Sequence, residues 1–215
     1  MRELNQRIRH LEMPERMHNL PIDDRGFPVP YFVAWLDGRP EFRAFDGEKM
    51  AICVRHKRCW LCGQPLGKYQ VFVIGSMCAV NRISAEPPSH RECALYAVSA
   101  CPFLTQPKMR RNEVDMPLES TQPAGLMLKR NPGVTLLWTT LKYFPFKAGK
   151  GVLFNVGDPK RVEWFCEGRP ATRADVLASI DSGYPLLREQ AERDGPDALV
   201  ELAQMHSKAM ELVPS

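Results

Sequence analysis

The chain of 215 residues lacks any apolar run near the roughly 20 residues that a membrane span needs. Its first seven residues, MRELNQR, contain no apolar segment of a secretory signal, so we expect a cytoplasmic protein with no membrane partner. A glycine-rich phosphate loop, a nucleophile-elbow serine and a His-Glu-x-x-His motif are also missing from the sequence. These absences favour a binding protein over an enzyme and leave an enzymatic activity open.

No large excess of one charge is present either. The net charge is +4, far from the strongly basic balance of a dedicated DNA-binding protein. The charge is +3 over residues 1–106, +5 over 107–150 and −4 over 151–215. A basic middle could form a nucleic-acid face and an acidic end could bind protein, although ordinary charge scatter is the plainer interpretation. The content of 44% hydrophobic and 25% charged residues excludes a disordered, collagen-like or coiled-coil chain.

The cysteines do not suit a disulfide scaffold, because their number is odd and no secretory signal accompanies them. The seven are Cys53, Cys59, Cys62, Cys78, Cys93, Cys101 and Cys166. A Cys-x-x-Cys pair and the crowding of five cysteines between 59 and 101 favour a reducing compartment and a thiolate metal site. Cys53 and Cys166 lie in apolar surroundings and are predicted to be core residues.

Alternation of apolar residues and turn signals such as Asp37-Gly38 predict a set of short strands. We expect strands at 31–36, 41–45, 71–74, 77–80, 134–140, 151–156 and 161–166. Cap residues predict a helix over 47–56 after Asp46 and another over about 90–100 after a Ser89/Glu92 capping box. A Thr172/Asp175 capping box predicts a helix through about Ile180, with Gly183 as its left-handed cap residue. Two further helices are expected at about 185–193 and 197–212, with Pro196 in the first turn of the last one.

This order of elements predicts an α+β fold, with a zinc module packed against short antiparallel strands and a C-terminal helical segment. We divide the chain into four parts. They are an N-terminal arm and hairpin (1–47), a zinc-binding module (48–106), a proline-rich loop or linker (107–133), and β-strands followed by C-terminal helices (134–215).

Four residues have the spacing of a closed metal site: Cys59, Cys62, His90 and Cys93. A Cys-x-x-Cys turn lets two thiolates reach one ion, and Gly63 permits the tight chain reversal that follows. His90 and Cys93 are three residues apart in the first turn of a predicted helix, so their side chains share a face. Three sulfurs and one imidazole are a common tetrahedral donor set for structural Zn²⁺.

A cysteine knuckle with glycine, a predicted β-hairpin over about 69–82 and a helix that supplies the second ligand pair resemble a treble-clef zinc finger. The resemblance covers residues of about 57–101, and the rest of the chain resembles uncharacterised bacterial or phage proteins. It implies a structural zinc and this local fold. Treble clefs serve nucleic-acid binding, protein docking and nuclease chemistry, so the resemblance leaves the function open.

Three other kinds of chemistry could use some of the same residues. Cys78 and Cys101 could join the cysteines in an Fe–S cluster, which would suit a redox-sensing protein. The His90-Arg91-Glu92 triplet matches the His-x-Glu of zinc deaminases, but the cysteine pair comes first and Cys93 would fill the coordination position that a catalytic zinc keeps open. A treble-clef nuclease needs a further histidine near the hairpin, and the sequence has none there.

The favoured function is nucleic-acid binding by a basic face beside the knuckle. The expected contact residues are Arg55, Lys57, Arg58, Trp60, Arg82 and Arg91. Trp60 could stack on a base, or it could be buried against the predicted hairpin beside a solvated basic turn. The alternative is a protein adaptor or inhibitor that docks through its C-terminal helices. Those helices carry a partial apolar stripe, formed by Leu199, Leu202, Met205 and Met210. The oligomeric state cannot be predicted from these patterns.

Overall fold

The computed structural model describes residues 3–106, 109–110, 131–149 and 151–215. It is an α+β protein with antiparallel sheets, as predicted. Most of the predicted 107–133 linker lies outside the described residues. The strands are β1 (Val33–Leu36), β2 (Arg39–Phe45), β3 (Gln70–Gly75), β4 (Ile83–Ser84), β5 (Thr135–Thr140), β6 (Phe144–Ala148), β7 (Gly151–Asn155), β8 (Pro159–Cys166) and β9 (Arg169–Pro170). The helices are η1 (Glu15–Met17), α1 (Gly47–His56), α2 (Ser76–Asn81), α3 (Arg91–Ala100), α4 (Pro102–Thr105), α5 (Arg173–Asp194) and α6 (Pro196–Met210).

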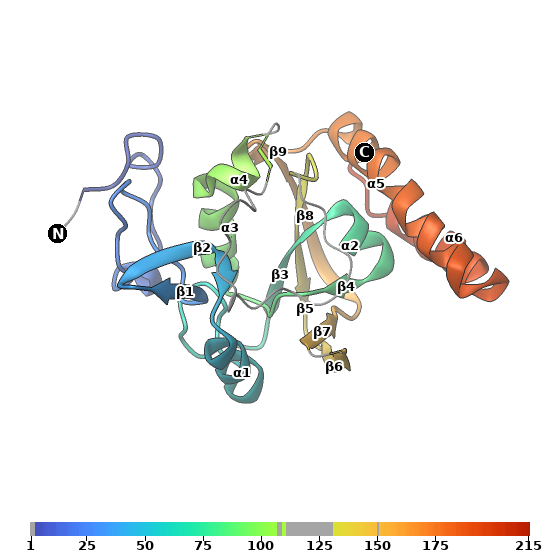
Figure 1. Ribbon diagram of the computed structural model, residues 1–215. Helices are drawn as coiled ribbons and strands as arrows, with labels where there is room; N and C mark the ends of the chain where they lie inside the picture. Colours follow the sequence, from blue (N-terminus) through green and yellow to red (C-terminus); the bar gives the residue numbers. More distant parts are fainter. Residues whose placement is uncertain (1–2, 107–108, 111–130, 150) are drawn as a thin grey trace.

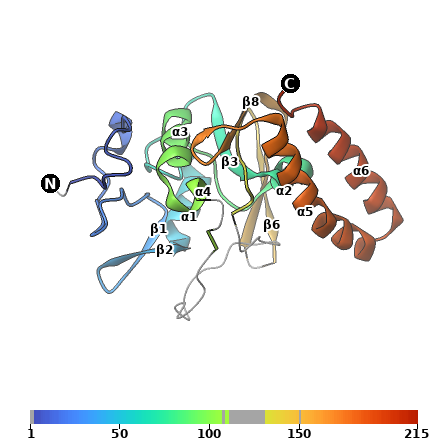
Figure 2. The ribbon, with the colours of Figure 1, turned by 90° about the horizontal axis from the view of Figure 1, so that it is seen from above.

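A central sheet with the order β3-β5-β8-β9 joins the predicted zinc module to the C-terminal part of the chain. Helices cover both of its faces: α3 lies on one side, and α2 with α5 and α6 on the other (Figures 1 and 2). Alternate residues of β3 accordingly enter different cores, with Val71 packed beside α3 and Phe72 in the core that contains Ile180 of α5. Burial on both faces explains why β3 and β5 contain consecutive apolar residues, at 71–74 and 136–138, instead of alternating ones.

The N-terminal arm, residues 3–30, and the β1–β2 hairpin form a separate layer beyond α3 (Figure 1). Asp37 and Gly38 both have positive φ, which confirms the predicted tight turn of this hairpin. The Asp46 carboxylate accepts hydrogen bonds from two backbone amides of α1, which confirms the predicted cap. The arm packs on α3 and the knuckle through a core that contains Ile8 and Met17 together with Cys59, Cys62 and Cys93.

The predicted return strand at 77–80 is wrong, because these residues belong to helix α2. Its apolar side chains pack against α5 and α6 and against the central sheet, which a strand in a hairpin with β3 would not allow. Gly183 does not end α5: a Cβ there would lie 2.6 Å from Cγ of Met77, so this glycine makes room for α2 in the middle of the long helix. The helix predicted at 185–193 is therefore the second half of α5.

The predicted capping box at Ser89 and Glu92 is also wrong. The N-cap of α3 is His90, with no side-chain cap hydrogen bond. The backbone of Ser89 instead exchanges two hydrogen bonds with Val71, and Glu92 forms an ion pair with Arg16 of the arm. At α5 the predicted Thr172/Asp175 capping box is confirmed, and Pro196 begins α6 as predicted. No helix of the described residues is long and apolar enough to cross a membrane.

Candidate metal centre

The first half of the centre is the turn that follows α1. Lys57 adopts a left-handed conformation that ends the helix and directs the chain into Cys59. The amide of Gly63 donates to the Cys59 carbonyl at 2.8 Å, and the amide of Cys59 donates to the Gln64 carbonyl at 2.8 Å. Gly63 has φ +74°, and a Cβ there would lie 2.6 Å from the ring of Tyr31. The turn therefore requires glycine at this position, as the sequence pattern predicts.

The second half is the N-terminus of α3. His90 is the N-cap residue and Cys93 lies in the first turn, so both side chains face the knuckle. The antiparallel bridge between Val71 and Ser89 holds this helix start against β3. Two distant segments of the chain are thereby brought to one point.

The ligand atoms of Cys59, Cys62, His90 and Cys93 all lie within 4.8 Å of one another, and all four residues are buried. Nδ1 of His90 is 3.4 Å from Sγ of Cys62 and 3.9 Å from Sγ of Cys93. Zn–S bonds of about 2.3 Å and Zn–N bonds of about 2.0–2.1 Å at tetrahedral angles place two sulfurs about 3.8 Å apart and a sulfur and a nitrogen about 3.6 Å apart. The donor set therefore has the size of a site for one tetrahedrally coordinated ion.

Hydrogen bonds with the backbone orient two of the candidate ligands, Cys59 and His90, toward a shared ion. Nε2 of His90 lies 2.9 Å from the Pro65 carbonyl, so this nitrogen donates to the backbone and Nδ1 is left to face the sulfurs. The amides of Cys62 and His90 donate to Sγ of Cys59 at 3.5 and 3.4 Å. Amide donors of this kind soften the negative charge of a thiolate.

The electrostatics of the four groups also favour a cation. Burial raises the pKa of the Cys59 thiol, but hydrogen bonds from Cys62, Cys93 and His90 outweigh burial and lower that pKa. Hydrogen bonding to Cys59 in turn raises the pKa of Cys93, and hydrogen bonds to Cys59 and Cys62 raise the pKa of His90 to about 10. Without a cation the buried donors have to share protons among themselves. A divalent ion replaces those protons and satisfies all four donors at once.

The other cysteines lie outside this group. Cys53 and Cys166 are buried, in agreement with the predicted core role. Cys78 lies on α2 and packs against the central core, and Cys101 is the C-cap residue of α3. Among the described residues, the structure groups neither Cys78 nor Cys101 with the other candidate ligands.

The predicted contact residues for nucleic acid do not form one face. Trp60 is only 2% exposed, and its ring stacks on Phe32 at 4.9 Å with Phe45 at its edge. The prediction that Trp60 stacks on a base is therefore wrong: the β1–β2 hairpin covers the indole. Arg58 is half-buried and donates to the Gly63 carbonyl at 2.9 Å, so it supports the knuckle.

Two more of the predicted cations are already neutralised. Arg82 pairs with Asp158 at 2.8 Å, and Arg91 donates to both oxygens of Glu163 at 2.6 and 2.9 Å. In contrast, Arg55 and Lys57 are exposed at the end of α1, and neither has an ion-pair partner within the described part of the chain.

The apolar stripe of the C-terminal helices is used inside the protein. Leu202 is buried, Leu199 and Met205 pack with it around Val80 of α2, and Met210 packs against the central core. These contacts account for the stripe without a docking partner.

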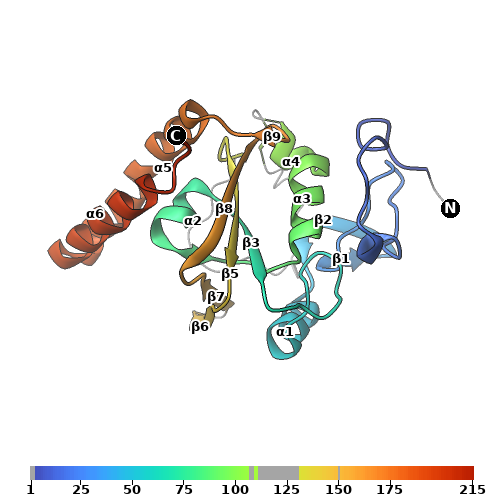
Figure 3. The same ribbon diagram turned by 180° about the vertical axis from the view of Figure 1, so that it is seen from behind.

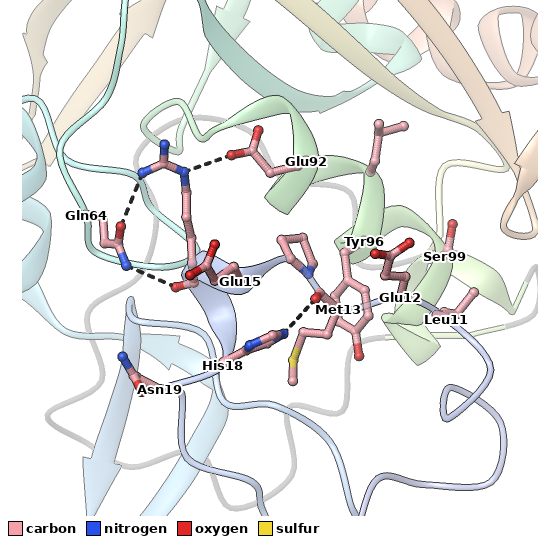
Figure 4. Close-up of a pocket in the computed structure, with 13 residues that line it drawn as sticks. Leu11, Glu12, Met13, Glu15, His18, Asn19, Gln64, Glu92, Tyr96 and Ser99 are labelled. Atoms are coloured by element: carbon pink, nitrogen blue, oxygen red, sulfur yellow. Dashed lines mark hydrogen bonds and ion pairs between the residues drawn. The ribbon is translucent and has the colours of Figure 1, made fainter.

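A pocket of about 1060 Å³ lies between the N-terminal arm and α3, a feature that the sequence patterns did not indicate (Figure 4). Some of its polar groups bind one another. Arg16 donates to Glu92 at 2.9 Å and to the Gln64 side chain at 3.2 Å, and His18 contacts the Met13 carbonyl at 2.9 Å. These two hydrogen bonds of Arg16 attach the arm to the knuckle and to helix α3. Sequence spacing could not have paired Arg16 with Glu92, since 76 residues separate them.

The described residues thus contain a group of four buried Cys and His side chains that can hold a metal ion. Searches against family models, curated proteins and solved structures found no match to this chain.

Proposed function

We propose that this chain is a non-enzymatic protein built around one structural Zn²⁺ and that its partner is nucleic acid. The observation that carries the proposal is the closed set of four buried donors, which leaves no coordination position for a substrate or an activated water. The ligands belong to the same core as Ile8 and Met17 of the arm, so an ion at this site stabilises the attachment of the N-terminal layer.

The zinc finger that the site most resembles is the treble clef. A knuckle and a ligand-bearing helix are both present, and the Val71–Ser89 bridge supplies the antiparallel contact between them. Helix α2 takes the place of the hairpin return strand. A Cys₃His set suits zinc better than an Fe–S cluster, because its donors are spaced for one ion and Cys78 and Cys101 are not grouped with them.

Nucleic acid is favoured as the partner because Arg55 and Lys57 project from the end of α1 next to the knuckle. Exposed and unpaired cations are the residues that bind phosphates, and each phosphate contact makes the affinity depend on salt. The adaptor alternative loses its main support because the C-terminal stripe packs internally.

The test measures binding of the zinc-loaded chain to labelled DNA and RNA over a series of salt concentrations. We expect the affinity for nucleic acid to fall steeply with salt and to be lost in a chain carrying Arg55→Glu and Lys57→Glu. Lys208→Glu, which reverses an exposed charge on α6, is the matched control and should weaken binding much less. Absence of binding, or binding that the α1 reversals leave intact, would refute the nucleic-acid proposal.

A further inference from the structure

The end of the central sheet next to β6 gathers exposed aromatic and basic side chains. Six residues define this surface, which we call the basic-aromatic end: Lys68, Tyr69, Lys142, Phe144, Phe146 and Lys147. Phe144 is 61% exposed, Tyr69 57% and Phe146 42%, although rings of this size usually bury most of their surface. Three of the four exposed large aromatic residues in the described part of the chain therefore lie here.

The register of the strands brings these residues together although they are far apart in the sequence. Gln70, which follows Tyr69, pairs with Thr140 across β3 and β5. The Thr140 hydroxyl donates to the Lys142 carbonyl at 2.8 Å, and β6 begins two residues later. In Figures 1 and 3, β6 and β7 lie at the same end of the molecule as α1.

This end also adjoins the cations that the proposed function invokes. Tyr143, just before β6, packs against the same core as Met50 and Val54 of α1. The amide of Leu66, two residues before Lys68, donates to the Lys57 carbonyl at 2.8 Å. The basic-aromatic end and the end of α1 are therefore connected through both the core and the backbone.

The charges on this end are of one sign. Residues 67–70, 141–149 and 156–160 contain a single acidic residue, Asp158, and it is paired with Arg82. Lys68, Lys142 and Lys147 have no ion-pair partner among the described residues. The surface therefore suits a partner that is anionic along its length.

Two features discriminate among anionic partners. Phe144 and Phe146 alternate along β6 on the face of Leu153 and Asn155, so their rings stand beside each other at the edge of a three-stranded sheet. Rings in such a row can stack on successive bases, which are accessible only in unpaired strands. Pro145 between them lacks an N–H group, and proline in an edge strand disfavours the addition of a further protein strand.

We infer that the basic-aromatic end binds single-stranded nucleic acid, with Tyr69, Phe144 and Phe146 stacking on bases and the three lysines contacting phosphates. This inference rests on the proposed nucleic-acid function and specifies the form of the nucleic acid and the side chains that recognise it. Stacking and charge together give strand selectivity without requiring a particular sequence.

The experiment compares Kd for a labelled oligo-dT of about 20 nucleotides, a length that exceeds the usual site size, with Kd for a duplex of equal length. Tighter binding of the single strand is expected. Replacing Phe144 or Phe146 by Ala should raise Kd about 5- to 150-fold each, the usual effect of losing one stacked base. Each Lys→Gln change should reduce the slope of log Kd against log salt by about 0.7.

Trp35→Ala is the matched control, because Trp35 is 43% exposed on the β1–β2 hairpin away from this end. Its Kd should equal that of the unchanged protein. Thermal melting should show that Phe144→Ala and Phe146→Ala remain folded, since both residues are exposed and neither belongs to a buried core cluster.

The results separate this inference from the function on which it rests. If the Arg55→Glu and Lys57→Glu changes abolish binding but the aromatic substitutions have no effect, the proposed nucleic-acid function stands and this inference is wrong. Equal affinity for duplex, or for polyglutamate, would show that charge alone is recognised and would also overturn it. No binding of any nucleic acid would refute both.

Discussion

Replacing Cys93 by Ser tests whether the four-residue group binds an ion that stabilises the fold. Cys93 is fully buried, and its Sγ lies 3.9 Å from Nδ1 of His90. The substitution removes one donor while it preserves the size of the side chain. Structural zinc sites contribute about 10–16 kcal/mol of apparent binding free energy, so an even division among four ligands assigns about 2.5–4 kcal/mol to each.

A loss of this size is a large part of the about 5–15 kcal/mol that stabilises an ordinary domain. In a chain of this length each kcal/mol shifts Tm by about 2–4 °C, so Cys93→Ser should lower Tm by about 5–16 °C. Zinc content after dialysis should fall well below one ion per chain. A chelator should lower Tm of the unchanged protein and have little further effect on the variant.

Cys78→Ser is the matched control, because Cys78 is a half-buried cysteine on α2 outside the ligand group. It should keep one zinc per chain and lose only about 1 kcal/mol, the usual cost of a polar atom in a core position. Full zinc content and an unchanged Tm in Cys93→Ser, or zinc loss in Cys78→Ser, would refute the assignment of the ligands.

Three further predictions follow from the same structure. Gly63→Ala should lower stability by at least about 1–2 kcal/mol, because a left-handed backbone disfavours a Cβ and the added carbon meets the Tyr31 ring; an unchanged denaturation midpoint would contradict this. Chelation should expose the arm to trypsin at sites such as Arg16, whereas identical digests with and without chelator would show that the ion does not hold the arm. The hydrogen bond from Arg169 lowers the pKa of Asp175, so this group stabilises the fold above its unfolded pKa of about 3.9 and the contribution is lost as pH falls through the lower folded value. Asp175→Asn should flatten the acid limb of a stability–pH curve, and an acid limb of unchanged slope would be inconsistent with the capping box.

Local sequence signals predicted the structure correctly where a few neighbouring residues determine the backbone geometry. The Asp46 cap, the Asp37-Gly38 turn and the Thr172/Asp175 capping box are each made within one or two turns of chain, and all are present. The spacing of the candidate ligands likewise predicted that Cys59 and His90 lie at one site. The knuckle orients one pair of ligands and the start of the helix orients the other.

The patterns failed where tertiary packing decides the structure. The apolar run after Gly75 fits a strand or a short helix, and contacts with α5 and α6 select the helix. Gly183 is a common helix stop in sequence, but here it is a point of close contact with α2. Strand β6 was not predicted because Pro145 interrupts its pattern. No local signal showed that the β1–β2 hairpin, and not the hairpin expected over about 69–82, would cover Trp60.

The most direct test of the central claim is metal analysis and absorption spectroscopy of protein purified without oxygen. We expect a colourless protein with about one zinc per chain. After substitution by Co²⁺ we expect the intense visible spectrum of tetrahedral thiolate coordination. Iron with visible absorption, or no bound metal in a protein that remains fully folded, would contradict a single structural zinc held by Cys59, Cys62, His90 and Cys93.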